Sequence, residues 1–160
     1  MEKLLTLIAM LPAISLSGAC FGVDSIEEDK IFYTVTTHGS TRFLSFAYAL
    51  GYHYTNSTQV SIGPIFSFSS LAAGETRIGI LSGLRYHYDI KDIGIAPYIN
   101  ANLGILSSGF SDYNLAYRIS SGVDFPISPK ASLSVGYYLE RGMLSRGYLH
   151  GPEVGVNFNF

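Results

Sequence analysis

The 160-residue sequence has no tryptophan, a single cysteine and few charged side chains. The lone Cys20 excludes a disulfide framework within the chain and a cysteine-rich zinc site. Charged residues make up 14% of the chain, against about 25% in typical soluble domains. The formal net charge is −2, and the lack of a basic excess argues against a nucleic-acid-binding protein. Beyond residue 30 no apolar run reaches the roughly 18 residues of a membrane-spanning helix.

The first segment has the layout of a secretory signal peptide. Lys3 precedes an apolar stretch, Leu4–Leu16, and small residues follow at 17–19. This pattern predicts a signal peptide over residues 1–19, cleaved before Cys20. Because Cys20 directly follows the cleavage position, both lipidation of its thiol and ordinary cleavage stay open. Residues 20–30 are polar and acidic, which predicts a periplasmic linker.

Residues 31–160 alternate between apolar and small or polar side chains with a period of two. Such alternation is typical of β-strands that have two different faces. The segments that show it are 31–37, 41–54, 59–69, 76–88, 93–106, 112–125, 131–142 and 153–160. We therefore expect an all-β protein, with the eight strands forming an antiparallel up-and-down transmembrane β-barrel.

The composition of the two faces indicates the surroundings of that barrel. One face carries Leu, Ile, Val, Phe and Tyr, whereas the other carries mostly Gly, Ser, Asn and Ala with a few charges. A soluble sandwich would place many Lys and Glu on its outer face. A small, nearly uncharged second face is instead expected in the narrow interior of a barrel that turns its apolar face to lipid.

Turn-rich links at 55–58, 89–92 and 126–130 are expected on the periplasmic side, and the short links 38–40, 70–75, 107–111 and 143–146 on the outer side. Tyrosine pairs recur before two of the periplasmic turns, in Leu50–Tyr54 and Leu84–Tyr88. Aromatic rings with a wet edge favour membrane interfaces. The residues that we expect to form an aromatic girdle are Tyr52, Tyr54, Tyr86, Tyr88, Phe125, Phe158 and Phe160.

Charged residues on the small face are predicted to pair inside the barrel, since burying a single charge is costly. The predicted network in the lumen consists of Arg118, Glu153, Glu140 and Arg85. Counting back from Phe125 and Phe160 places Arg118 and Glu153 at one depth, so we expect these two to face each other with Glu140 above. The network would close the barrel; a proton or ion path is the alternative. His53 and His87 are expected to be polar fillers of the lumen, and no metal site is predicted.

Several stretches resemble the Ail/Lom family of small outer-membrane proteins, the OmpX-like group. They are Ala116–Tyr117, Gly122–Pro129 and Val135–Glu140, together with the closing strand Val154–Phe160. The resemblance covers about residues 31–160 and implies an eight-stranded barrel with a role in adhesion or serum resistance. In that family long outer loops carry the role, whereas the outer links here are short.

A lipid A-modifying barrel enzyme is the main alternative. The chain resembles lipid A deacylase barrels around Pro97–Ala101, but the region Tyr137–Arg141 lacks the His-x-Ser pair of their penultimate strand. No nucleophile elbow and no phosphate-binding glycine loop occurs, so we expect neither an enzyme nor a cofactor. A soluble lipocalin-like barrel is a further alternative, disfavoured because its ligand-binding face would be the small polar one.

The function expected from the sequence is therefore a structural or surface-interaction role in the cell outer membrane. Expected partners are outer-membrane lipid and lipopolysaccharide, the barrel-assembly machinery acting on the strand that ends at Phe160, and a host surface ligand. We expect a monomer that binds no nucleic acid.

Overall fold

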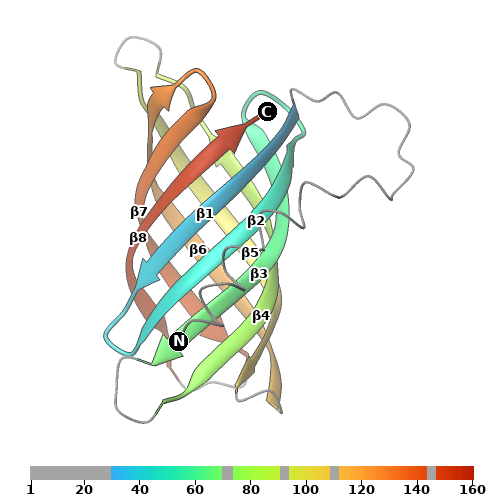
Figure 1. Ribbon diagram of the computed structural model, residues 1–160, viewed down its shortest axis with the longest axis vertical. Helices are drawn as coiled ribbons and strands as arrows, with labels where there is room; N and C mark the ends of the chain where they lie inside the picture. Colours follow the sequence, from blue (N-terminus) through green and yellow to red (C-terminus); the bar gives the residue numbers. More distant parts are fainter. Residues whose placement is uncertain (1–29, 70–73, 91–93, 109–111, 144–146) are drawn as a thin grey trace, which may run out of the picture.

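The computed structural model describes residues 30–69, 74–90, 94–108, 112–143 and 147–160. The chain forms eight antiparallel strands that close into a barrel (Figure 1). The strands are β1 (Ile31–Gly39), β2 (Phe43–His53), β3 (Thr58–Ser69), β4 (Thr76–His87), β5 (Ala96–Ser108), β6 (Asp112–Ser128), β7 (Ala131–Gly142) and β8 (Leu149–Asn159). The antiparallel up-and-down barrel predicted from the alternation is confirmed.

Closure comes from β1, which pairs with β2 on one side and with β8 on the other. The β1–β8 ladder runs from Phe32 opposite Asn159 to His38 opposite Glu153. No helix in the described ranges is long and apolar enough to cross a membrane. The predicted signal peptide (1–19) and all of the predicted linker except Lys30 lie outside the described residues, as does Cys20.

The two ends of the barrel differ in their connections (Figure 1). The links β2–β3, β4–β5 and β6–β7 lie at the end that also holds Ile31 and Phe160, hereafter the C-terminal end. The strands β1, β3, β5 and β7 end at the opposite end. The β2–β3 turn is tight: the Tyr54 amide donates to the Thr58 carbonyl at 2.9 Å. In the β4–β5 link Gly94 has a φ of 62°, a left-handed conformation that favours glycine.

Some strand limits differ from those that the sequence predicts. β6 continues to Ser128, through the first part of the predicted 126–130 turn, and its register against β7 shifts between Pro126 and Ser128. Proline has no amide hydrogen to donate to a ladder, which accounts for an irregularity there. β8 begins at Leu149 rather than 153, because residues 149–152 pair with β7.

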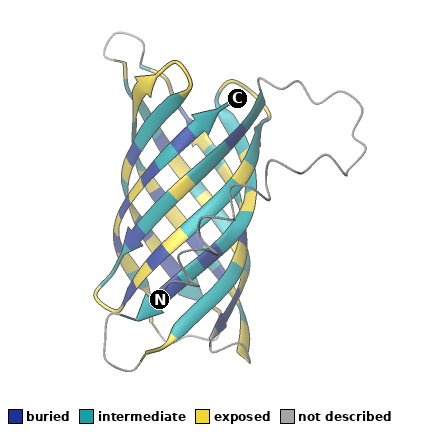
Figure 2. Ribbon diagram, in the orientation of Figure 1, coloured by how far each residue is buried: buried dark blue, intermediate teal, exposed yellow. Residues whose placement is uncertain are grey.

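Exposed and buried residues alternate along the strands (Figure 2). The outward face carries Leu, Ile, Val, Phe and Tyr, as expected. The inward face is less uniformly small than predicted, since Ile65, Leu81, Leu106 and Ala116 form an apolar cluster inside the barrel. Other large side chains buried there are Phe32, Phe43, Tyr98 and Tyr138. An eight-stranded barrel needs them because small side chains alone would leave its interior empty.

Candidate functional site in the barrel lumen

Three arginines and three carboxylates of the inward face form a network of contacts inside the barrel. Two of the carboxylates bind guanidinium groups and the third, Glu153, binds His38. All six residues come from β4, β6, β7 and β8. They are Arg77, Arg85, Arg118, Asp124, Glu140 and Glu153. Pairing of this kind is what a low-dielectric interior demands, because an unpaired buried charge is destabilising.

Glu140 on β7 is the centre of the part of this network that lies nearer the opposite end of the barrel. It is buried and binds two guanidinium groups: Arg118 Nε donates to Glu140 Oε2 at 3.1 Å, and Arg77 Nη2 donates to Glu140 Oε1 at 2.7 Å. Arg118 Nη2 also donates to Oε2. Arg118 and Glu140 are direct neighbours across the β6–β7 ladder. Arg77 approaches from the other side of the lumen, on β4.

The expected direct pair between Arg118 and Glu153 is wrong, because His38 lies between them. Arg118 Nη1 is 3.1 Å from His38 Nδ1 and 2.8 Å from His38 Nε2, and His38 Nε2 is 3.0 Å from Glu153 Oε2. In the neutral tautomer with its proton on Nε2, His38 can donate to Glu153, and Nδ1 is the ring atom that can accept from Arg118. His38 also belongs to β1, rather than to the outer link predicted at 38–40.

Tyr98 joins Glu153 to the part of the network that lies nearer the C-terminal end. Its hydroxyl donates to Glu153 Oε1 at 2.8 Å although three strand spacings separate β5 from β8. The row that connects them runs Tyr98, Gly122, Gly136, Glu153 across neighbouring ladders. A Cβ built on Gly136 would lie 2.5 Å from the Tyr98 hydroxyl, so the two glycines leave the space in which the tyrosine crosses.

The Arg85 guanidinium packs against the Tyr98 ring and continues the network to Asp124. Its guanidinium carbon is 3.7 Å from the centre of the Tyr98 ring, and Nη2 donates to Asp124 at 2.5 Å. Asp124 in turn accepts from Ser134 Oγ at 2.5 Å. Arg118, Glu153, Glu140 and Arg85 therefore belong to one continuous set of contacts, linked through His38 and Tyr98.

Two residues of this network were not singled out from the sequence, although alternation held a signal for both. His38 falls on the inward face with Thr34 and Thr36, and Tyr98 falls there with Asn100 and Asn102. Aromatic rings in such barrels are expected outside, so Tyr98 is easily assigned to the wrong face. Only the two glycines in the neighbouring strands reveal that a ring fits inside.

The other residues considered from the sequence lie elsewhere. His53 Nε2 is 3.1 Å from Asn159 Oδ1 in the C-terminal end of the lumen, and His87 is buried there. No group of three metal-ligating side chains occurs among the described residues. Five of the seven expected girdle residues are exposed, namely Tyr54, Tyr86, Tyr88, Phe125 and Phe160. Tyr52 is half-buried, and Phe158 stacks on Tyr33 with ring centres 4.6 Å apart.

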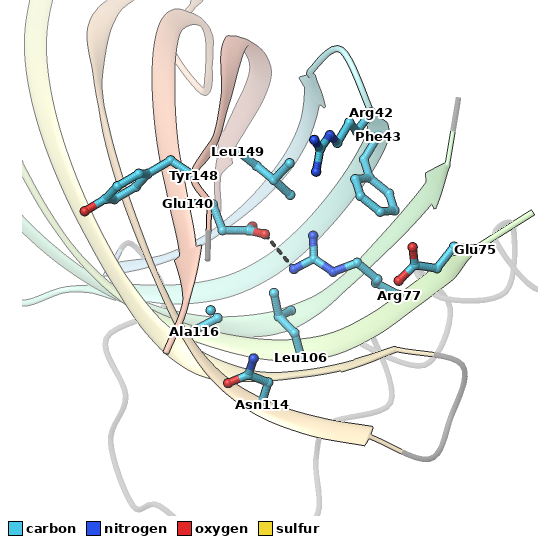
Figure 3. A pocket seen from close by; sticks show the side chains of 12 residues that line it. Arg42, Phe43, Glu75, Arg77, Leu106, Asn114, Ala116, Glu140, Tyr148 and Leu149 are labelled. Atoms are coloured by element: carbon cyan, nitrogen blue, oxygen red, sulfur yellow. Dashed lines mark hydrogen bonds and ion pairs between the residues drawn. The ribbon is translucent and has the colours of Figure 1, made fainter. Parts of the chain in front are cut away.

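The network divides the lumen into separate cavities. Toward the opposite end lies a cavity of about 340 Å³, with Arg77 and Glu140 in its wall (Figure 3). Toward the C-terminal end lies one of about 440 Å³. Between them, beside His38, Arg118 and Glu153, remains a cavity of about 60 Å³. A space of that size accommodates a few water molecules and no larger solute.

Removing the Tyr98 hydroxyl should weaken the barrel measurably. We expect Tyr98→Phe to lower the free energy of unfolding by about 1–3 kcal/mol, because the buried Glu153 carboxylate loses a hydrogen bond. The aromatic ring of residue 98 keeps its place, so the substitution removes the hydroxyl alone. Urea titration of the barrel in lipid vesicles measures the change. Tyr88→Phe, at an exposed outward tyrosine, is the matched control and should leave stability unchanged. Equal effects of the two substitutions would contradict a role for the Tyr98–Glu153 bond.

No family model matches the sequence, and no curated protein matches it. Among solved structures, Neisserial surface protein A (NspA) is 17% identical, with a TM-score of 0.63 over 82% of this chain and 95% of that one. The N-terminal barrel domain of Pseudomonas aeruginosa OprF is 16% identical, with a TM-score of 0.63 over 83% and 98%. The outer membrane enzyme PagL is 13% identical, with a TM-score of 0.52 over 81% and 99%. The chain thus shares the fold of small outer-membrane barrels.

Proposed function

We propose that the protein is a monomeric, non-enzymatic barrel of the Gram-negative outer membrane with a structural or surface-interaction role. The observation that carries the proposal is the distribution of charge and apolar area. Large apolar side chains such as Ile62, Ile80 and Ile105 are more than half exposed, while six charged residues, each bound to a charged or polar partner, lie inside. A water-soluble barrel has the reverse arrangement, whereas a barrel in lipid requires this one.

In this proposal the C-terminal end of the barrel faces the periplasm and the opposite end faces outward. The signal peptide would deliver the chain to the periplasm, where both barrel termini would remain. The seven girdle residues named above would mark the inner interface. The strand ending at Phe160 would engage the barrel-assembly machinery, and the outward face would contact lipid and lipopolysaccharide.

The network of three arginines and three carboxylates favours a closed barrel over a transport pore. A transport pathway needs continuous space for its solute, and the middle cavity of about 60 Å³ does not provide it. Membership of the Ail/Lom family, with its adhesion and serum-resistance roles and a host surface ligand, is the finer form of the proposal. The described link residues at the opposite end, 40–42, 74–75, 143 and 147–148, would then bear any such interaction.

Fractionation tests the location. Expressed with its signal peptide in a Gram-negative host, the protein should be recovered only with detergent from the outer membrane. It should also migrate faster on gels before boiling, because a closed barrel stays folded in detergent. Recovery of a monodisperse, detergent-free protein from the periplasm would overturn the proposal.

The enzymatic alternative has its own test. The similarity to PagL extends to the fold, and the Tyr137–Arg141 segment contains neither histidine nor serine. We expect lipid A incubated with the folded barrel to keep all of its acyl chains and phosphates in mass spectra. Loss of an acyl chain, absent with a heat-denatured control, would replace the non-enzymatic role with a lipid A-modifying one.

A further inference from the structure

The outward face of the eight strands carries a single Lys, Arg, Asp or Glu, and this residue is Arg141. By alternation every other such residue in the strands belongs to the inward set: Arg77, Arg85, Asp112, Arg118, Asp124, Glu140 and Glu153. A cation on a lipid-facing surface is costly in the middle of the bilayer and tolerated near its edge. The depth of Arg141 therefore decides whether it can be accommodated.

Arg141 lies near the opposite end of β7, one residue before the strand ends at Gly142. From Ala131, at the start of the strand, ten residues rising about 3.3 Å each at a tilt of about 40° span about 25 Å along the barrel axis. That is the height of the apolar band expected for such barrels. Arg141 thus reaches the level of lipid head groups, on the side that we propose faces outward.

The neighbours of Arg141 are tyrosines. Its Nη1 donates to the Tyr148 hydroxyl at 2.8 Å, and its guanidinium carbon is 4.9 Å from the centre of the Tyr148 ring. The Tyr148 hydroxyl points away from the outer cavity (Figure 3), so this contact is not part of the lumen network. Tyr117 lies opposite Arg141 in the β6–β7 ladder. No described carboxylate lies within 4.0 Å of the guanidinium.

A second hydrogen-bond donor, the His150 ring, lies on the same outward surface as Arg141. His150 belongs to β8, lies opposite Leu139 of β7 and is exposed. Its Nδ1 is 2.5 Å from the Tyr137 hydroxyl. When the hydroxyl donates to Nδ1, the ring proton is on Nε2, which is then available to donate to a ligand. Arg141 and His150 therefore form a pair of donors framed by Tyr117, Tyr137 and Tyr148, hereafter the Arg141 patch.

We propose that the Arg141 patch binds the phosphate group of a phosphorylated lipid in the outer leaflet. This inference rests on the proposed outer-membrane location and names a partner for it. Guanidinium groups bind phosphate through two parallel hydrogen bonds, and such charge-assisted bonds are strong near an apolar surface. Along the same outward face toward the C-terminal end lie Leu139, Val154 and Val135, all exposed. They would contact the acyl chains, which a free phosphate ion lacks, and this favours a lipid as the occupant.

Native mass spectrometry of the folded full-length protein, released from lipid vesicles, tests the inference. The probes are lipid A with both phosphates and the same lipid A after dephosphorylation. We expect the wild type to bind the phosphorylated form about tenfold more tightly, and Arg141→Gln to lose that preference. Arg141→Lys, which keeps the charge without the planar fork, should retain part of it. Lys130→Gln removes one cation at the C-terminal end and should bind like the wild type.

The outcomes separate this inference from the function on which it rests. Equal binding of the two lipids by the wild type, or unchanged preference in Arg141→Gln, would overturn the Arg141 patch while the barrel still inserts. Displacement of the lipid by inorganic phosphate at equal concentration would show a free-anion site and overturn the lipid assignment. Failure of the wild type to enter vesicles, seen as no difference between boiled and unboiled migration, would overturn the proposed location and this inference with it.

Discussion

Replacing Glu140 with glutamine is expected to lower the free energy of unfolding by about 3–5 kcal/mol, the typical cost of breaking a buried ion pair. The shape of the side chain is kept, but Arg118 and Arg77 lose their shared carboxylate. Both guanidinium groups are largely shielded from solvent, with side-chain exposures of 3% and 12%. Because Arg118 cannot move into water without disrupting the barrel, the loss should exceed that of any other single charge in the lumen.

Urea titration in lipid vesicles measures this loss, and a double-mutant cycle identifies the partner. Adding Arg118→Gln to Glu140→Gln should recover part of the stability, since it removes one of the two uncompensated cations. Adding Glu153→Gln instead should give no recovery, because Glu153 is bound to His38 and Tyr98. The matched control is Glu75→Gln, at an exposed carboxylate of the outer rim, which should change stability by less than about 0.5 kcal/mol. Recovery with Glu153→Gln and none with Arg118→Gln would contradict the network.

Introducing arginine at Ile80 is the second large expected effect and bears on the membrane itself. Ile80 is 58% exposed on the outward face near the middle of β4, opposite Pro64 and Ile105 in the adjoining ladders. A charge at the bilayer midplane costs about 2–4 kcal/mol, so Ile80→Arg should destabilise the folded barrel by that amount. Folding yield and urea titration in vesicles both report the change.

The control for Ile80→Arg is the same substitution near the end of a strand. Tyr113 is the second residue of β6, also outward, and 71% exposed. At interface height an arginine costs about 0–1 kcal/mol, so Tyr113→Arg should fold almost like the wild type. A barrel that tolerates Ile80→Arg as well as Tyr113→Arg would have water, not lipid, around its middle.

Residue spacing predicted which charged residues lie in the lumen, but it did not predict which of them pair. Counting from the strand ends assigned Glu153 to Arg118, but the ladder places Glu140 directly beside Arg118. Two causes combine in this error. β6 extends three residues beyond the assumed end at Phe125, and β7 lies between β6 and β8. In a closed barrel the strands are tilted and staggered, so equal distance from the chain turns does not mean equal depth.

The sequence by itself determined the class of this protein, because period-two alternation is a local property of each strand. It determined which side of each strand carries the charges and hence that they would meet inside a closed sheet. Only the tertiary structure decided which charges meet, that His38 bridges two of them, and that Tyr98 crosses above Gly122 and Gly136. Those contacts depend on the stagger between strands far apart in the chain, and alternation carries no information about stagger.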